Sequence, residues 1–336
     1  MKNRDQASQG PGEPGAAWAL SLTVPTSIGP FFDLQVNGYA GVDFNSDGLT
    51  ASALHAACEQ LRADGVAGIL ATIITDDLGK MCARLGRLAD LCDSDPLARQ
   101  MVQGFHIEGP FLNENTGYIG AHPARHAMTA RADAMERLVQ AAAGRTRLVT
   151  LAPERDPGLR VTRLLAERGI LIAAGHTDAS LDQLRAALDA GLSMFTHLGN
   201  GCPLTLPRHD NIVQRVLSLA ERFTAISFIA DGAHIPLFSL RNYLRIVPED
   251  RVVIVSDSIS AAGLGPGRYT LAGQEVCIGA DLVPRAAAGH LVGSACPLAR
   301  MAENLRQIGI DDSTIVRWLA DTPSQLLGLD GTSDIL

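Results

Sequence analysis

The chain has 336 residues, a formal net charge of -8 and a pI near 5.6, and this length suits either two average domains or one large α/β barrel. The acidic balance and the absence of a Lys/Arg cluster argue against nucleic acid as a partner, because proteins that bind phosphate backbones carry a basic face. Hydrophobic residues make up 46% and aromatic residues only 4%, which favours helices on a parallel sheet over an aromatic-rich β-sandwich.

The arrangement of the cysteines and the composition of the N-terminus predict the cellular compartment of the protein. Six cysteines are scattered without a Cys-x-x-Cys pair, so we expect reduced thiols in a cytoplasmic protein. Residues 1–15 lack the pattern of a signal peptide, and no apolar run reaches the roughly 18 residues of a membrane span. We expect no membrane partner, and we divide the chain into a partly disordered N-terminal extension (1–29), one main domain (30–330) and a short tail (331–336).

From residue 31 onward one pattern repeats: an apolar run that ends on a polar residue, followed by a segment with apolar residues three and four apart. The predicted strands cover residues 31–38, 66–75, 101–109, 147–154, 170–177, 192–200, 224–232 and 251–258. The predicted helices between them cover residues 50–63, 78–93, 132–143, 157–168, 180–190, 211–220 and 236–247. Eight alternating units predict a (β/α)8 barrel of the TIM type, because parallel strands need crossover helices.

Two segments interrupt this pattern, and long loops in a compact domain are often functional. Residues 113–130 form a long loop after the third strand, with His122 and His126. Residues 263–293 are rich in glycine and follow the eighth strand, and within them 268–271 and 274–278 predict a hairpin. Residues 297–327 return to helical periodicity, with helix starts expected at 312 and 322.

Three polar residues at strand ends predict a metal site. Glu108 ends the third strand just before Gly109 and Pro110, and a buried carboxylate must be paired, protonated or bound to a metal. His176 and His197 end the fifth and sixth strands, which meet Glu108 at one mouth of the barrel. Each side chain alone is more simply a buried polar group with hydrogen bonds. Two imidazoles and a carboxylate together are the ligand set of a catalytic Zn²⁺ site, although other divalent ions suit it too.

Asp257 ends the eighth strand, where a carboxylate could take a proton from water and return it to a leaving amine. The alternative is a cap of the following turn. Gln35 and Asn37 share one face of the first strand, and because neutral amides are poor metal ligands, we expect one metal ion. His122, Arg208 and His234 lie in loops after strands and are candidate substrate contacts, since charge-assisted hydrogen bonds are strong.

Read together, these stretches resemble the N-acetylglucosamine-6-phosphate deacetylases of the amidohydrolase superfamily. The similar motifs are DLQVNGYAGVDFN at 33–45, GFHIEGPFLN at 104–113, GHTD at 175–178, THLGNGCP at 196–203, ADGAH at 230–234, SDS at 256–258 and LVGSA at 291–295. The resemblance spans most of residues 31–328. It implies hydrolysis of the acetamide of N-acetylglucosamine-6-phosphate to acetate and an amino sugar phosphate.

The resemblance also implies roles for individual residues. One metal ion would be held by Glu108, His176 and His197, with Asp257 as general base and then acid and His122 polarising the acetyl carbonyl. The substrate contacts that it implies are Ala121, His122, Asn200, Gly201, Arg208, Asp231, His234, Val292 and Gly293. Members of the family often form homodimers, and they carry a small β-sandwich that we expect to be absent or vestigial in this sequence.

Two other interpretations stay open from the sequence. The same metal site would serve an amidohydrolase that cuts another N-acyl or cyclic amide. A non-catalytic sugar-phosphate-binding barrel is the second alternative, and the presence of Glu108, both histidines and Asp257 argues against it.

Overall fold

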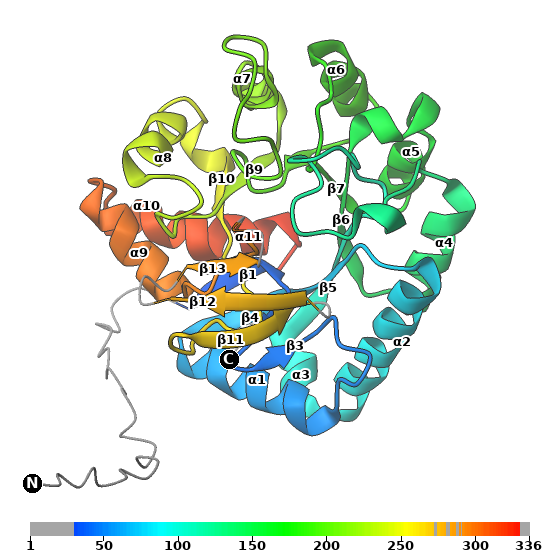
Figure 1. Ribbon diagram of the computed structural model, residues 1–336, viewed down its shortest axis with the longest axis vertical. Helices are drawn as coiled ribbons and strands as arrows, with labels where there is room; N and C mark the ends of the chain where they lie inside the picture. The colour runs from blue at the N-terminus through cyan, green and yellow to red at the C-terminus, as the bar shows by residue number, and fades with distance from the viewer. Residues whose placement is uncertain (1–29, 272–273, 280–282, 287–288, 290, 330–336) are drawn as a thin grey trace, which may run out of the picture.

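Eight parallel strands alternate with helices along the chain, as the sequence predicts. The computed structural model describes residues 30–271, 274–279, 283–286, 289 and 291–329, so the predicted extension and tail lie outside the described residues. One sheet contains the eight strands in the order of the chain. They are β1 (Phe31–Val36), β4 (Val66–Ile74), β5 (Val102–Glu108), β6 (Thr146–Leu151), β7 (Leu171–Ala174), β8 (Met194–Phe195), β9 (Ala225–Phe228) and β10 (Val252–Ile254). The helices surround this sheet on its outside (Figure 1), which confirms the TIM-type barrel.

The strands end earlier than predicted. The clearest case is β8, which has two residues instead of the nine expected. His176, His197 and Asp257 lie two or three residues beyond the ends of β7, β8 and β10 and have positive φ angles of 52°, 34° and 48°, so the strand conformation has ended before the polar residues. Such left-handed geometry costs a non-glycine residue about 1 kcal/mol or more and persists where surrounding contacts enforce it.

The predicted helices are present, with boundaries that follow their caps. Ser180 and Gln183 form a reciprocal capping box at the start of α6, and the Thr50 side chain caps α1. The α-helices between strands are α1 (Ala51–Ala63), α2 (Leu78–Ser94), α3 (Pro96–Met101), α4 (Ala132–Ala141), α5 (Arg160–Glu167), α6 (Leu181–Asp189), α7 (Ile212–Leu217) and α8 (Leu237–Leu244). Single 3-10 turns occupy Ala124–His126, Pro153–Arg155, Pro157–Leu159, Ala220–Arg222 and Glu249–Arg251.

The short helix α3 was not predicted, and the predicted third strand was wrong at its first residue, because Met101 ends this helix. The Asp95 side chain accepts hydrogen bonds from the backbone N–H groups of Leu97 and Ala98 at 2.8 and 3.1 Å. Pro96, which is well suited to a first helical position, follows this cap directly. Six residues are too few for helical periodicity to be visible.

The C-terminal helices cover the outside of the barrel where β1 and β10 meet. A continuous segment of α10 (Asp312–Val316), a π-helical turn (Arg317–Asp321) and α11 (Thr322–Leu326) follows α9 (Leu298–Gln307). The π-helical turn and α11 contact both β1 and β10. No helix in the described part of the chain is long and apolar enough to cross a membrane.

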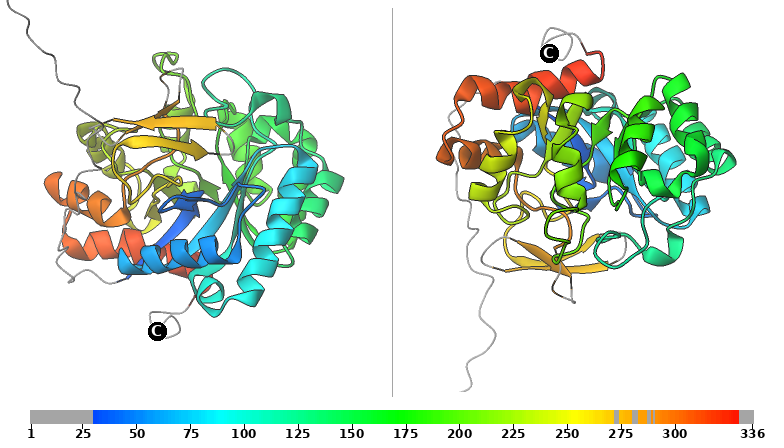
Figure 2. Two further views of the ribbon diagram at one scale, coloured as in Figure 1. Left: turned by 60° about the horizontal axis from the view of Figure 1, so that its bottom comes forward. Right: turned by 90° about the horizontal axis from the view of Figure 1, so that it is seen from above.

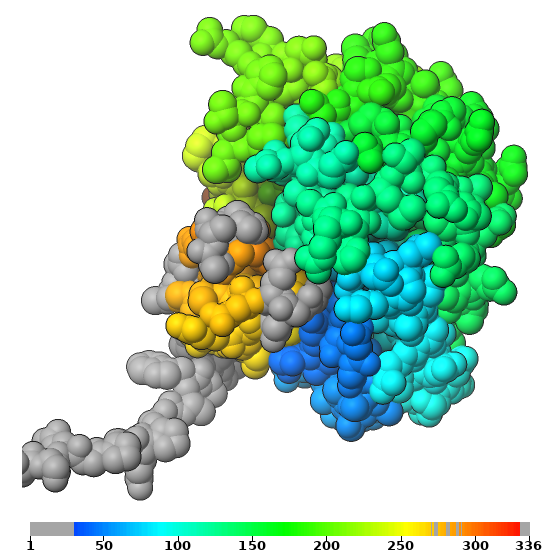
Figure 3. Space-filling view, turned by 45° about the vertical axis from the view of Figure 1, so that its right-hand side comes forward, coloured from blue at the N-terminus to red at the C-terminus, as the bar shows by residue number. Residues whose placement is uncertain are grey.

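The predicted hairpin after β10 is present and has a third strand. An antiparallel sheet joins β11 (Gly267–Leu271), β12 (Gln274–Ile278) and β13 (Pro284–Ala286). This sheet lies across one end of the barrel, away from α11 (Figure 2), and its surface adjoins that of the N-terminal half of the chain (Figure 3). Ile74, Ile259 and Val292 form its apolar contacts with the rim. No β-sandwich is present in the residues that the structure describes.

A short ribbon of β2 (Gly38–Tyr39) and β3 (Val42–Asp43) follows β1, and Gly38 is where its backbone packs most closely. A Cβ atom at Gly38 would lie 2.3 Å from the Val42 carbonyl oxygen and 2.9 Å from the Ser260 nitrogen. Backbone atoms cannot rotate away, so we expect Gly38→Ala to lower the free energy of unfolding by about 1–3 kcal/mol. Urea unfolding measures this, and Gly265→Ala, with open space around its Cβ, should change little.

Candidate metal centre

The structure brings Glu108, His176 and His197 together at the barrel mouth. Glu108 Oε1 lies 3.3 Å from His176 Nε2 and 3.1 Å from His197 Nε2, and the three ligand atoms are within 4.8 Å of one another. All three side chains are buried. They lie at or just beyond the ends of β5, β7 and β8, so strands that are separated along the chain converge at one mouth, as predicted.

These residues fit one divalent ion. Ligand atoms about 2.1 Å from a tetrahedral ion lie about 3.4 Å from one another, close to the separations of Glu108 from both histidines. His176 Nδ1 lies 2.7 Å from the Tyr118 carbonyl oxygen, which can only accept a hydrogen bond. The proton of neutral His176 is therefore on Nδ1, and the lone pair of Nε2 faces Glu108 and His197, as in other metal-binding histidines.

Charge at this cluster is concentrated on two carboxylates. Burial alone would raise the pKa of Glu108, but the neighbouring imidazoles of His176 and His197, 3.3 and 3.1 Å away, hold that pKa well below its ordinary value. Glu108 is therefore ionised, as a metal ligand must be. Burial, together with the negative charge of Glu108, raises the pKa of Asp257 from 3.8 to about 6. A carboxyl group with this pKa is matched to proton transfer near neutral pH.

Gln35 and Asn37 connect the cluster to Asp257. Gln35 Nε2 donates to Glu108 Oε2 at 3.2 Å and to Asp257 Oδ1 at 3.1 Å. Asn37 Nδ2 donates to the same Asp257 oxygen at 2.8 Å. Both amides thus act through their nitrogens, which cannot bind a metal ion, and the one-metal interpretation of these two residues stays a prediction.

His122 lies against the cluster and is held by a backbone group. Its ring centroid is 4.5 Å from that of His176 in an edge-on arrangement, and Nε2 is 3.8 Å from Glu108 Oε2. Burial lowers the pKa of His122 to about 3, so the imidazole is neutral. The Thr75 N–H donates to Nδ1 at 3.4 Å. The ring proton must therefore be on Nε2, which makes this nitrogen a hydrogen-bond donor toward the mouth.

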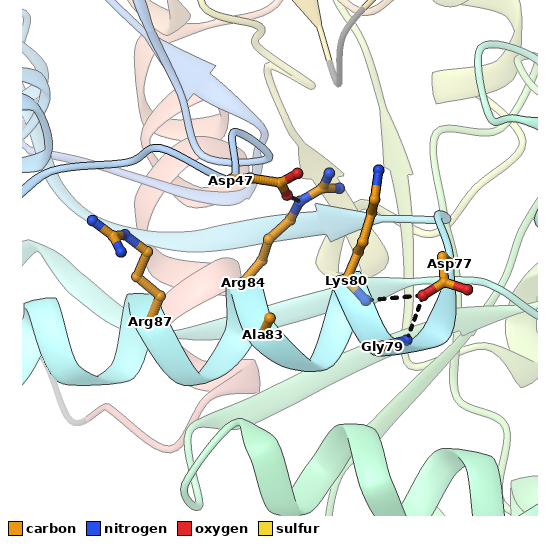
Figure 4. A pocket seen from close by; sticks show the side chains of 7 residues that line it. All are labelled: Asp47, Asp77, Gly79, Lys80, Ala83, Arg84 and Arg87. Carbon is orange, nitrogen blue, oxygen red and sulfur yellow. Dashed lines mark hydrogen bonds and ion pairs between the residues drawn. The ribbon is translucent and has the colours of Figure 1, made fainter.

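The loop that carries His122 is also tied to α2. His126 Nε2 lies 3.3 Å from Asp76 Oδ1, and Arg84 Nη2 pairs with Asp76 Oδ2 at 2.9 Å. Arg84 also pairs with Asp47 at 2.7 Å and forms one wall of a surface pocket of about 500 Å³. The pocket is lined by Asp47, Asp77, Gly79, Lys80, Ala83, Arg84 and Arg87 (Figure 4). The Asp77 carboxylate accepts from the backbone N–H groups of Gly79 and Lys80, and the pocket contains none of the predicted site residues.

His234 and Asp231 form a hydrogen-bonded pair beside β9. His234 Nδ1 lies 2.7 Å from Asp231 Oδ2, and Asp231 Oδ1 accepts from the backbone N–H groups of Ala233 and His234 at 2.9 Å each. The Ser294 hydroxyl donates to Asp231 Oδ2 at 3.0 Å. Both Asp231 oxygens are thus used within the protein, so this residue orients His234, whose Nε2 has no hydrogen-bond partner among the residues that the structure describes.

The remaining predicted substrate contacts are distributed around the mouth. Asn200 turns its amide toward the His197 carbonyl oxygen at 3.3 Å, and a Cβ atom at Gly201 would lie 2.9 Å from His176 Nδ1. Val292 is buried, with Ala121 packed against the same apolar cluster, and Gly293 follows it with a positive φ. Arg208 lies exposed in the loop before α7, with no ion pair or hydrogen bond recorded for it within the described ranges.

The prediction from sequence missed the groups that hold these side chains. The Thr75 N–H and the Tyr118 carbonyl are backbone groups, which every residue has, so no sequence signal marks them. Asp33 is different, because its spacing from Gln35 and Asn37 places all three on one face of the strand predicted at residues 31–38. That period of two could have identified it.

Asp33 offers a test by pH. Burial raises the pKa of Asp33 from 3.8 to about 7. The folded protein therefore keeps a proton that the unfolded chain releases, and the stability from this group, complete below about pH 4, is lost as the pH rises through 7. A pKa difference of about 3 corresponds to about 4 kcal/mol. Between pH 4 and 8 the parent should lose up to this much free energy of unfolding through Asp33, whereas Asp33→Asn should not. Urea unfolding of both proteins across this pH range measures the difference. Parallel pH profiles of the two proteins would contradict the expectation.

A (β/α)8 barrel with a Glu/His/His cluster at the C-terminal ends of its strands defines a metal-dependent hydrolase of the amidohydrolase kind. The crystal structure of a dihydroorotase agrees in fold, with a TM-score of 0.51 at 10% identity over 91% of this chain and 75% of that chain. No protein-family model matches the sequence.

More similar proteins identify the family. An N-acetylgalactosamine-6-phosphate deacetylase of Escherichia coli O157:H7 is 30% identical over 90% of this chain and 78% of its own length. An N-acetylglucosamine-6-phosphate deacetylase of Bos taurus is 32% identical over 90% and 76%. The structure of a variant of the Mycobacterium smegmatis N-acetyl-D-glucosamine-6-phosphate deacetylase in complex with N-acetyl-D-glucosamine-6-phosphate has a TM-score of 0.81 at 27% identity, covering 90% of this chain and 78% of that one. The chain belongs to the N-acetylglucosamine-6-phosphate deacetylase family, which confirms the resemblance of its motifs.

Proposed function

We propose that this protein hydrolyses the N-acetyl group of N-acetylglucosamine-6-phosphate to glucosamine-6-phosphate and acetate. The observation that carries the proposal is the Glu108, His176 and His197 cluster, linked through Gln35 to Asp257 and contacted by His122, in a chain of this family. The three residues would hold one divalent ion, for which we propose Zn²⁺ because two imidazoles and a carboxylate suit it. Such an ion supplies Lewis acidity, which polarises a carbonyl and acidifies water.

The protein side chains account for the proton transfers. Asp257 takes a proton as water adds to the acetyl carbonyl carbon, and later delivers it to the amide nitrogen as the carbon–nitrogen bond breaks. Acetate and the free amine are then the products, so one water molecule is consumed. His122, neutral because it is buried, donates its Nε2–H to the oxygen that becomes negative.

The sugar phosphate would bind across the loops after β5, β8, β9 and β10. Ala121 and His122, Asn200 and Gly201, and Val292 and Gly293 would line the sugar, and His234, oriented by Asp231, would offer Nε2 to a hydroxyl or phosphate oxygen. Arg208 is the exposed cation suited to the phosphate. A homodimer and a cytoplasmic location are part of the proposal; the six cysteines are free thiols, as a reducing compartment requires.

A second substrate is favoured by one specific observation. The Escherichia coli relative at 30% identity is named for N-acetylgalactosamine-6-phosphate, the epimer at one ring carbon. The proposed chemistry is the same for both sugars, because the acetamide and the phosphate are shared. The choice would depend on the loops that contact the remaining hydroxyl groups.

The test is acetate release by metal-replete protein from both sugar phosphates, with unphosphorylated N-acetylglucosamine alongside. We expect turnover with at least one phosphorylated sugar and a kcat/KM lower by about 100-fold or more without the phosphate, since a charge-assisted contact contributes about 1.5–3 kcal/mol and the phosphate makes more than one. Absence of turnover in protein that holds one metal ion would contradict the proposed substrates.

A further inference from the structure

The barrel has a seam between its first and last strands. In the strand order of the sheet, β1 and β10 lie at opposite ends and do not pair with each other. Beyond β10 the chain continues through Ser256, Asp257 and Ser258, and this segment meets β1. The contact is an isolated bridge between Val36 and Ser258, with Asn37 N donating to the Ser258 carbonyl at 2.8 Å.

One side chain supplies the bond that a strand ladder would otherwise make. The Ser256 N–H lies 3.1 Å from Asp33 Oδ1 and 3.3 Å from Oδ2, and Gln35 N donates to Oδ1 at 3.2 Å. The Asp33 carboxyl group therefore joins the backbone of β1 to the residue that directly precedes Asp257. Val255 N, one residue earlier, donates to Phe228 of β9, so Asp33 takes over where the regular pairing stops.

Both the side chain of Asp257 and the backbone around it are therefore held by residues at or next to β1. Asp33 and Gln35 lie in β1 and Asn37 directly follows it. Gln35 and Asn37 bind the Asp257 carboxylate, while Asp33 binds the preceding backbone. The Asp257 backbone has a φ of 48°, a conformation that needs such external contacts to persist. Ser294 N holds the following side through the Asp257 carbonyl at 2.9 Å.

Burying the Asp33 carboxyl group at this position costs free energy. Its side chain is 2% exposed, and no ion pair with a Lys, Arg or His is recorded for it in residues 30–271 or the later described ranges. A buried carboxyl group without a cation costs several kcal/mol, roughly, if it ionises. An apolar side chain at position 33 would avoid this free-energy cost but could not accept a hydrogen bond. The backbone N–H groups of Ser256 and Gln35 both donate to the Asp33 carboxyl group.

We propose that Asp33 is a positioning residue, whose carboxyl oxygens hold the Ser256 N–H across the seam and thereby set the position of Asp257 over the metal cluster. The inference rests on the proposed function in one respect, the role of Asp257 as proton acceptor. The geometry requires a hydrogen-bond acceptor for the Ser256 N–H and does not require a charge. Asparagine at position 33 should therefore hold the Ser256 N–H, and valine should not.

The experiment compares Asp33→Asn, Asp33→Val and, in case valine prevents folding, Asp33→Ala, with Thr146→Val as a matched loss of a buried hydroxyl at the other end of the barrel. Hydrogen exchange of the peptide around residues 252–262 should be about tenfold faster in the valine and alanine variants, because the Ser256 N–H loses its acceptor. It should stay at the parental rate in Asp33→Asn and Thr146→Val. In the metal-loaded variants, kcat for acetate release should fall about 10- to 100-fold with valine or alanine, at an unchanged metal content and a KM within about threefold.

Equal hydrogen-exchange rates in all variants would overturn the proposal. A fall in kcat for Asp33→Asn as large as that for Asp33→Val would also overturn it. If the parent hydrolyses neither sugar phosphate, the proposed function fails by itself. Hydrogen exchange, which needs no substrate, still decides whether Asp33 holds the segment before Asp257.

Discussion

Asp257→Asn is expected to reduce kcat for acetate release by about 10²- to 10⁴-fold while the protein keeps its metal ion. Asparagine has nearly the same shape and retains an oxygen for the N–H groups of Gln35 and Asn37, which bind Asp257 at 3.1 and 2.8 Å. What it loses is the ability to take a proton from water. The fold, the Glu108 cluster and the substrate contacts therefore stay in place, and the change is concentrated in kcat.

The measurement is steady-state acetate release together with metal analysis of the purified variant. Asp156→Asn is a matched control, because Asp156 is also a buried aspartate, and its carboxylate binds Val161 N and Thr162 N at the start of α5. It should leave kcat within about threefold of the parent. An Asp257→Asn variant with parental kcat would show that another group moves the proton.

Glu108→Gln is expected to abolish both metal binding and activity. The carboxylate lies 3.1–3.3 Å from both histidine nitrogens and supplies the only anionic oxygen of the cluster, and a neutral amide is a weak ligand for a divalent ion. Because a ligand that binds only the folded state stabilises it by mass action, the parent should show a Tm that falls on chelation. The variant should show a Tm that chelation does not change.

Metal content and melting temperature, each with and without chelator, measure this expectation. Glu154→Gln is the control, since Glu154 lies at the same rim but binds Asn113 and the Asp178 backbone at 2.9 and 2.7 Å. That variant should keep its metal ion and its response to chelation. Retention of one ion per chain in Glu108→Gln would contradict the assignment of Glu108 as a ligand.

The fold could be predicted because its signals are local. Each strand is a short apolar run such as Val66–Ile74, and each helix has an apolar face and a cap such as Thr50 or Ser180. Eight repeats of one unit allow few closed arrangements of a parallel sheet. The short helix α3 and the third strand β13 were missed because six and three residues carry too little periodicity.

The candidate ligands were equally visible in the sequence. Glu108, His176 and His197 each end an apolar run, and the barrel topology places such ends at one mouth. The left-handed backbone of His176 and His197 was not visible, because contacts with distant segments, and not the residue type, impose it.

The sequence by itself determined the barrel, the order of its strands and the residue types available at its mouth. Only the tertiary structure decided which atoms face each other: the Thr75 N–H that leaves the His122 proton on Nε2, the Tyr118 carbonyl that orients His176, and the Asp33 carboxyl group that holds Ser256. The physical reason is that these bonds join residues 47 to 223 positions apart, and each of the three uses a backbone N–H or C=O group that no residue type marks.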